Sequence, residues 1–272
     1  MPPIKPPTIP DYLSRIGVPE PAPRTCPFDP GYDLATLGGH LEQSAHLMSV
    51  FKVSMACWML ADERVSRSKV ALARRHGVPV TTGGGPFEVA VVQGQLPAYL
   101  DLVADMGFTR IEAGQGFTDT ELDPETVVRL AGSRGLEVQY ELGDKHDGPF
   151  DEHAMRDLLR LGRAWLAAGA VELIIEGRED ANGVGLFDDS GAANWIFADR
   201  IAEAFGLAHV TFEAPTKASQ FAFLDHFGRD VRLSNVRLEE LLRVEIYRYG
   251  LHSDAFANPA LRPALIESAE AV

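Results

Sequence analysis

The sequence predicts an α/β protein: a single (β/α)₈ TIM barrel with a proline-rich N-terminal arm. Short apolar segments alternate with helical segments, about eight of each in roughly 230 residues, which is the usual size of such a barrel. The chain has 272 residues, 46% of them hydrophobic, so it can bury a large core. A doubly wound open sheet is the alternative, but the sequence lacks the Gly-x-Gly-x-x-Gly fingerprint of its dinucleotide-binding form.

The first third of the chain predicts the arm and the first strands. Prolines remove backbone donors and fix φ, so residues 1–23 are expected to form an extended arm over the surface or over a neighbouring subunit. The predicted elements are a weak strand over 24–28, a helix over 34–45, a strand over 47–53, a helix over 62–76 and a strand over 78–82. The helix over 62–76 has acids in its first turn, bases in its last and Gly77 after it, as the helix dipole favours.

Three glycines at 83–85 follow the strand over 78–82. Glycines allow close approach of a ligand to backbone N–H groups, although a flexible strand-to-helix turn is the alternative. Further helices are predicted over 96–106, 123–133, 151–168, 191–205, 217–227 and 238–247. Strands are predicted over 110–113, 136–142, 171–175, 209–213 and 230–233. The barrel is therefore expected over residues 24–256, followed by a C-terminal tail over 257–272.

Four of the predicted strands close on a glutamate: Glu112, Glu141, Glu176 and Glu213. Because the carboxyl ends of parallel strands face the same way, these acids should gather at one end of the barrel, where such folds keep their active sites. The structural alternative is a closed layer of ion pairs in which the glutamates are partners of Lys52, Lys145, Arg178 and Lys217.

Charge and composition limit the partners of the protein. The chain has 25 basic and 39 acidic residues and a formal charge of -14, which argues against nucleic acid or an anionic membrane surface. A local cluster of lysine and arginine can still hold a small anionic substrate. No apolar run approaches the ~20 residues of a membrane span and the start is unlike a signal peptide, so a cytoplasmic location is expected. Cys26 and Cys57 are predicted to be buried thiols.

Seven short runs, in order from Arg24 to about Phe256, resemble the phosphosulfolactate synthase family, which adds sulfite to phosphoenolpyruvate on a route to coenzyme M and has plant heat-stress-associated relatives. The runs are Phe51-Lys52, Gly83-Gly84-Gly85-Pro86-Phe87-Glu88, Glu141-Leu142-Gly143-Asp144-Lys145, Glu176-Gly177-Arg178-Glu179, Glu213-Ala214-Pro215-Thr216-Lys217, Val231-Arg232-Leu233-Ser234-Asn235-Val236, and Glu245 through Arg248-Tyr249-Gly250-Leu251 to Asp254.

The resemblance implies a lyase or synthase that uses Mg²⁺, a small anionic substrate and a homo-oligomer. It implies Lys145 as proton donor, with a pKa lowered toward neutrality, and Glu141 and Lys52 as further catalytic residues. Carboxylate oxygens suit Mg²⁺, so Glu112, Glu176 and Glu213 are the implied metal ligands. The implied substrate-binding residues are Gly84, Gly85, Arg178, Glu179, Lys217, Asn235, Arg248 and His252.

The chain also departs from the family pattern. Asp29-Pro30-Gly31 lacks the usual lysine, Met55-Ala56-Cys57 replaces Gly-Trp-Gly, Gly114-Gln115-Gly116 replaces Ser-Asp-Gly, Asp144 replaces the first of two lysines, and His252 replaces an arginine. These losses predict a substrate that is larger or less anionic than phosphoenolpyruvate. The alternatives are aldol-like, cyclising or hydrolytic chemistry, or a non-catalytic stress-associated barrel.

Overall fold

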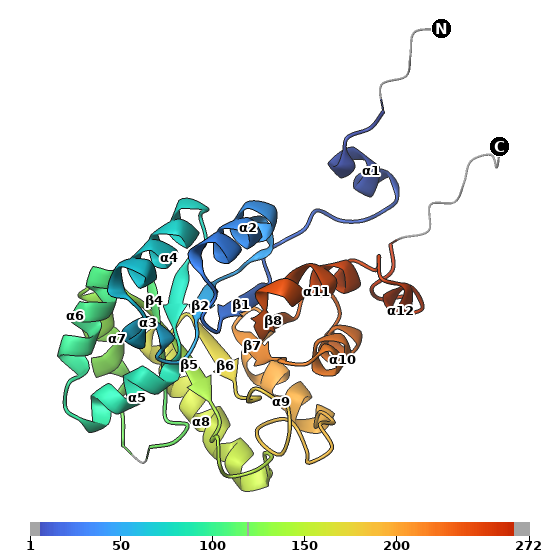
Figure 1. Ribbon diagram of the computed structural model, residues 1–272. Helices are drawn as coiled ribbons and strands as arrows, with labels where there is room; N and C mark the ends of the chain where they lie inside the picture. The colour runs from blue at the N-terminus through green and yellow to red at the C-terminus, as the bar shows by residue number, and fades with distance from the viewer. Residues whose placement is uncertain (1–5, 119, 264–272) are drawn as a thin grey trace, which may run out of the picture.

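Eight parallel strands form a closed barrel in the computed structural model, which describes residues 6–118 and 120–263 (Figure 1). Each strand is hydrogen-bonded to the next, and β8 returns to β1. This confirms the predicted (β/α)₈ barrel. The strands are β1 (Thr25–Asp29), β2 (Phe51–Val53), β3 (Val80–Thr82), β4 (Arg110–Gly114), β5 (Glu137–Leu142), β6 (Glu172–Ile175), β7 (Val210–Glu213) and β8 (Arg232–Arg237).

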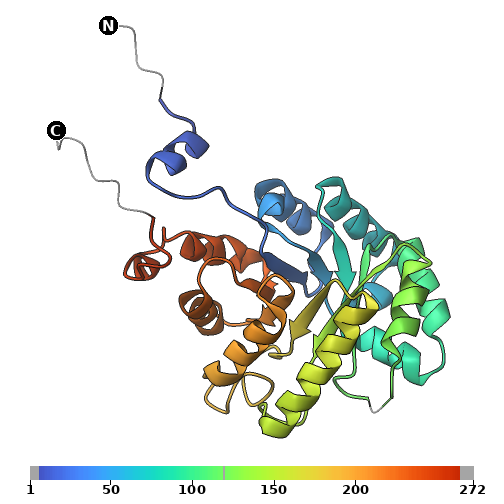
Figure 2. The same cartoon turned by 180° about the vertical axis from the view of Figure 1, so that it is seen from behind.

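Helices surround the barrel (Figures 1 and 2). The longer ones are α2 (Leu34–Ser44), α4 (Glu63–Arg75), α5 (Gly84–Val92), α6 (Leu96–Met106), α7 (Pro124–Gly132), α8 (Glu152–Ala168), α9 (Trp195–Phe205), α10 (Lys217–Phe227) and α11 (Leu241–Arg248). Shorter helices are α1 (Ile9–Arg15), α3 (Cys57–Leu60) and α12 (Ser253–Phe256), with 3₁₀ turns η1 (Ala45–Leu47) and η2 (Leu238–Glu240). None of the described helices is long and apolar enough to cross a membrane.

Alternation along β5 separates the core from the barrel interior. Tyr140 points outward and stacks on Trp165 of α8, with ring centroids 4.0 Å apart. Its neighbours Gln139 and Glu141 point inward, where Gln139 donates a hydrogen bond to Glu112 at 2.9 Å. The apolar core therefore lies between strands and helices, while polar side chains occupy the interior.

The N-terminal arm was predicted to be extended, but residues 9–15 form helix α1. Thr8 and Asp11 cap this helix reciprocally, so it has a local start signal that the proline content hid. No residue of α1 is buried, and both views show it apart from the barrel (Figures 1 and 2). Residues 1–5 of the predicted arm and residues 264–272, most of the predicted tail, lie outside the described residues.

Several predicted boundaries also shift. The strand predicted over 47–53 is only Phe51–Val53, because η1 occupies its start. The glycines at 84 and 85 are the first turn of α5, with Gly83 as its N-cap. Helix α9 begins at Trp195, four residues after the predicted start, since Asn194 provides its cap. Strand β8 runs on to Arg237.

Candidate active site

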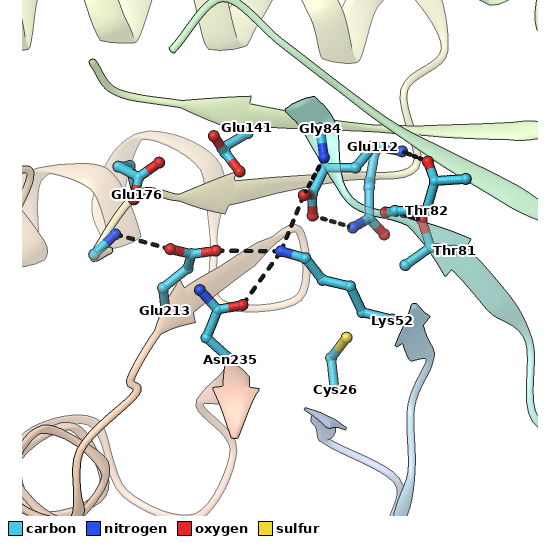
Figure 3. Close-up of polar contacts among 12 residues, drawn as sticks. Cys26, Lys52, Thr81, Thr82, Gly84, Glu112, Glu141, Glu176, Glu213 and Asn235 are labelled. Atoms are coloured by element: carbon cyan, nitrogen blue, oxygen red, sulfur yellow. Dashed lines mark hydrogen bonds and ion pairs between the residues drawn. The ribbon is translucent and has the colours of Figure 1, made fainter. Parts of the chain in front are cut away.

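Four glutamates at the carboxyl ends of β4 to β7 meet two lysines inside the barrel. Figure 3 shows the four glutamates with one of the lysines, Lys52 of β2. We call this group, Lys52, Glu112, Glu141, Lys145, Glu176 and Glu213, the acid layer. Each glutamate is at most 4% exposed. The predicted gathering of the four acids at one end of the barrel is therefore what the structure has, and they form ion pairs with Lys52 and Lys145.

Lys52 connects β2 with the opposite side of the barrel. Its Nζ lies 2.9 Å from Glu112 Oε1 and 3.4 Å from Glu213 Oε1. It also donates to Asn235 Oδ1 at 3.2 Å (Figure 3). Asn235 has φ 55° and is the extra residue where the β1–β8 register shifts, which is a β-bulge. The bulge accounts for an inward-pointing amide at this place.

Lys145 holds the other two glutamates. Its Nζ lies 2.7 Å from Glu141 Oε1 and also pairs with Glu176 Oε2. The Lys145 side chain is 30% exposed, whereas those of Glu141 and Glu176 are 3% and 1% exposed. The Lys145 side chain is thus the most exposed one of the acid layer.

Glycines leave room for the acid layer and enclose it. A Cβ at Gly84 would lie 3.6 Å from Glu112 Oε1 and 3.8 Å from Glu141 Oε2, so the two carboxylates face one space. A Cβ at Gly185 would lie 2.0 Å from the Glu176 carbonyl oxygen, and one at Gly177 would lie 2.8 Å from that of Glu213. Side chains are therefore excluded where the backbone packs around Glu176.

The acid layer carries an excess of negative charge: four carboxylates against two ammonium groups leave two uncompensated charges. Burial raises the pKa of Glu112 to about 7, although Lys52 opposes this. Burial, with the charges of Glu141 and Glu213, raises the pKa of Glu176 well above its usual range. Burial also disfavours the charged form of Glu141, but Lys145 and Lys52 outweigh it and lower its pKa to about 2. Both upward shifts favour the protonated carboxyls, in the direction that reduces the excess of negative charge.

The pKa values of both lysines are raised. Burial disfavours the charged form of Lys145, but the charges of Glu141 and Glu176 outweigh it and raise its pKa above the ordinary value. The same balance, set by Glu112 and Glu213, raises the pKa of Lys52. Anions rather than cations surround the Lys145 amine among the described residues, so the rise in its pKa runs opposite to the predicted lowering.

The predicted metal ligands Glu112, Glu176 and Glu213 are not grouped as a set. In residues 6–118 and 120–263, no three histidine, cysteine or acidic side chains are arranged to hold a metal ion. Each of these carboxylates accepts hydrogen bonds on both oxygens, for example Glu213 from Lys52 and from the Gly177 amide at 3.0 Å. The donor set still fits Mg²⁺ chemically, since it offers carboxylate oxygens with excess negative charge around the space at Gly84.

Comparison with known proteins decides the family. Residues 18–254 match the (2R)-phospho-3-sulfolactate synthase (ComA) family. The chain belongs to the phosphosulfolactate synthase family. It is 33% identical to the phosphosulfolactate synthase of Methanocaldococcus jannaschii, over 72% of this chain and 79% of that protein. It is 27% identical to that of Methanothermobacter thermautotrophicus, over 91% of this chain and 97% of that protein.

Membership of the phosphosulfolactate synthase family confirms the predicted resemblance and an enzyme of the lyase or synthase type. Among solved structures, UMP synthase of Leishmania donovani is similar, with a TM-score of 0.53 and 12% identity, over 89% of this chain and 57% of that chain. That likeness concerns the fold alone. Homo-oligomer formation and a cytoplasmic location stay predictions.

Two residues expected at the site of this phosphosulfolactate synthase family member lie elsewhere. Arg248 is 0% exposed and donates from Nη1 to the Arg229 and Val231 carbonyls, at 2.7 Å each, at the amino-terminal side of β8. His252 caps α12 and packs against Phe221 and Tyr247 of α10 and α11. Both placements follow from α11, which carries the chain from the carboxyl end of β8 back to the other end of the barrel.

Other predicted substrate-binding residues do belong to the carboxyl-end loops. Arg178, Glu179 and Lys217 follow β6 and β7 and are exposed, and Gly85 lies beside the acid layer in the first turn of α5. Arg178 has φ 57°, and its amide donates to Glu176 Oε1 at 2.6 Å. Arg178 and Lys217 form no ion pair with any residue that the structure describes. Of the four cations predicted as partners of the glutamates, only Lys52 and Lys145 therefore form such pairs.

Sequence reasoning missed Gln139 and Glu88. Gln139 on β5 donates a hydrogen bond to Glu112 on β4. Residues two apart on a strand lie on the same face, so its position two residues before Glu141 could have indicated that it points into the barrel. Glu88 is 1% exposed and accepts hydrogen bonds from the loop after β4. It stood in the matched glycine-rich run, but only the helical conformation of that run turns it toward the loop.

Proposed function

We propose that this chain adds sulfite, or a related nucleophile, to the double bond of phosphoenolpyruvate or a similar enol acid. The supporting observation is Lys145: a partly exposed side chain whose ammonium group is held between two buried carboxylates, Glu141 and Glu176, at the carboxyl end of the barrel. The names of the relatives favour the same reaction.

The reaction requires one bond to form and one proton to be delivered. The sulfur lone pair of sulfite forms a C–S bond with the terminal carbon of the enol, and the electrons of the C=C bond move toward the carboxylate to give an enediolate. Lys145 then protonates the carbon that bears the phosphate, which completes the addition. Glu176, whose pKa burial raises, lies in contact with Lys145 and would return the proton.

Positive groups would bind the acid and phosphate groups of the substrate. Helix α5 begins beside the acid layer, and the Gly84 amide already donates to Glu112 Oε1 at 3.0 Å. Arg178 and Lys217, exposed on the loops after β6 and β7, are suited to phosphate or carboxylate oxygens. The acid layer would lie below the substrate, with Glu179 and Asn235 at its edge.

Mg²⁺ is proposed as the cofactor. Glu112 and Glu141 would hold it, because their oxygens flank the space at Gly84 and because Mg²⁺ is commonly bound by one or two carboxylates with water and substrate oxygens. When bound, the ion supplies charge stabilisation for the enediolate.

The direct test follows the loss of enol absorbance with phosphoenolpyruvate, sulfite and Mg²⁺. Lys145→Met should lower turnover by about 10²-fold or more, the usual contribution of a positioned acid or base. Lys69→Met is the control, because Lys69 is another lysine paired with a buried carboxylate, Asp29 at 2.7 Å, outside the acid layer. Wild-type turnover that persists in Lys145→Met would contradict the assigned role.

A less anionic substrate is the second candidate. Pro30 and Asp144 stand where the family usually has lysines, and Asp144 adds a negative charge next to Lys145. His252 no longer supports this argument, because it lies outside the site. This candidate would be favoured if the protein did not turn over phosphoenolpyruvate but bound keto acids whose side chains carry no charge.

A further inference from the structure

Two exposed apolar residues lie next to the start of α5, the helix whose first turn adjoins the acid layer. Met55 follows β2 and is 51% exposed, and Phe117 follows β4 and is 42% exposed. A Cβ at Gly83 would lie 2.7 Å from the Met55 backbone nitrogen, and one at Gly85 would lie 3.9 Å from Phe117 Cε1. The Met55 backbone and the Phe117 ring therefore both border the start of α5. We call this pair the apolar wall.

The segment that carries Phe117 is held in place by buried hydrogen bonds. Glu88 accepts from the Gly116 amide at 2.9 Å, the Phe117 amide at 3.1 Å and Thr118 Oγ1 at 2.9 Å. The Gly116 carbonyl in turn accepts from the Lys145 amide at 2.9 Å. Phe117 is thus fixed next to the segment of the proposed proton donor, and Glu88 is a positioning residue for it.

The same segment touches the Lys145 side chain. A Cβ at Gly116 would lie 3.2 Å from Cγ and Cε of Lys145, so only glycine lets the chain pass this close. The residue that follows is the exposed phenylalanine. Its place directly after the glycine that packs on Lys145 distinguishes Phe117 from the isolated exposed apolar residues that are normal on protein surfaces.

The two sides of the site differ in character. The loops after β6 and β7 offer Arg178 and Lys217, whereas the loops after β2 and β4 offer Met55 and Phe117. Phosphoenolpyruvate has no apolar group that would cover the apolar wall. Removing apolar area from water is favourable roughly in proportion to the area, so a substrate with an apolar group would bind better. The apolar wall also lies in or next to two of the runs that depart from the family pattern.

We infer that the substrate of this enzyme is an enol or keto acid with an aliphatic or aromatic group that packs against Met55 and Phe117. The acid end lies toward Arg178 and Lys217, an orientation that rests on the proposed function. The apolar wall thus determines which acid is accepted, and Lys145 acts on whichever acid is bound.

Binding of matched keto acids tests the inference without any turnover. Isothermal titration with pyruvate, 4-methyl-2-oxopentanoate and phenylpyruvate, each with Mg²⁺, should give affinities that rise in that order. Burying half of the added phenyl group predicts about tenfold or more between the first and the last acid. Equal affinity for the three acids, or no binding of any of them, would overturn the inference.

Variants identify the surface responsible. Phe117→Ser and Met55→Ser should each remove most of the preference for phenylpyruvate and leave pyruvate binding unchanged. Ile196→Ser is the control, because Ile196 is 72% exposed on α9, outside the barrel. A preference that survives in Phe117→Ser and Met55→Ser would refute the role of the apolar wall.

The turnover assay separates this inference from the proposed function. Efficient turnover of phosphoenolpyruvate with no preference for apolar acids would sustain the proposed reaction and overturn the inference. A strong preference for phenylpyruvate without phosphoenolpyruvate turnover would sustain the inference and exclude phosphoenolpyruvate as substrate.

Discussion

Replacing Lys52 with methionine tests the charge balance of the acid layer. Lys52 is 5% exposed and contacts Glu112 and Glu213 from β4 and β7. Methionine keeps most of the volume of the side chain and removes its charge. The variant leaves Lys145 as the one ammonium group for the four glutamates of the acid layer, so the uncompensated charge rises from two to three.

The expected cost can be estimated from the contacts. Removing one partner of a buried ion pair destabilises a protein by about 3–5 kcal/mol. In a chain of this size about 1 kcal/mol lowers the melting temperature by about 2–4 °C, so a fall of about 6–20 °C is expected.

The cost should also depend on pH. The pKa of Glu112 in the folded protein is raised to about 7 from its ordinary 4.5. A raised carboxyl pKa stabilises the fold at low pH, and this contribution is lost as the pH rises through about 7. Without Lys52, the fold depends still more on the protonated form of Glu112. Lys52→Met should therefore destabilise the protein more at pH 8 than at about pH 5.5.

Thermal unfolding of wild type, Lys52→Met, Glu112→Gln and the double variant at both pH values measures these effects. Glu112→Gln should recover part of the stability lost in Lys52→Met, because the neutral amide does not need the missing cation. Arg67→Met, which removes an exposed ion pair on α4, should change the melting temperature little. A melting temperature of Lys52→Met close to wild type at pH 8, or no recovery in the double variant, would refute the reasoning.

Three further predictions concern other parts of the molecule. Gly185→Ala should unfold at a much lower temperature than Gly206→Ala in thermal melts. Both positions have positive φ, but a Cβ at 185 would lie 2.0 Å from the Glu176 carbonyl oxygen, whereas a Cβ at 206 would have no heavy atom of another described residue within 4 Å, its chain neighbours aside. Arg248→Met should lower the free energy of unfolding by about 3–5 kcal/mol in urea, because Arg248 is a buried partner in an ion pair. The KM for substrate should not change, because Arg248 lies at the opposite end of the barrel from the acid layer; a raised KM would contradict this placement. Iodoacetamide at pH 8 should leave Cys26 unlabelled in the native protein, detected by mass spectrometry, because burial raises its thiol pKa to about 12; rapid native labelling would contradict its burial.

Local signals predicted the elements most reliably where caps and dipoles agreed. The helix predicted over 62–76 is α4, with Asp62 as N-cap and arginines in its last turn. The start of α1 was missed although Thr8 and Asp11 form a capping box, because the surrounding prolines dominated the pattern. The loop before α9 was shortened in the prediction, because the residues after Gly191 carry no signal that separates a cap from a turn.

The sequence by itself determined the barrel and the place of the four glutamates, because alternation of strands and helices sets the topology and the carboxyl ends of parallel strands must share one side. It did not determine the partners of each charge. The ion-pair alternative named Lys52, Lys145, Arg178 and Lys217 as partners of the glutamates, but only Lys52 and Lys145 form these pairs among the described residues. Arg248, near Asn235 in the chain, is at the other end of the barrel. Only tertiary structure decides such contacts, since they join elements far apart in sequence and depend on which way each helix returns the chain.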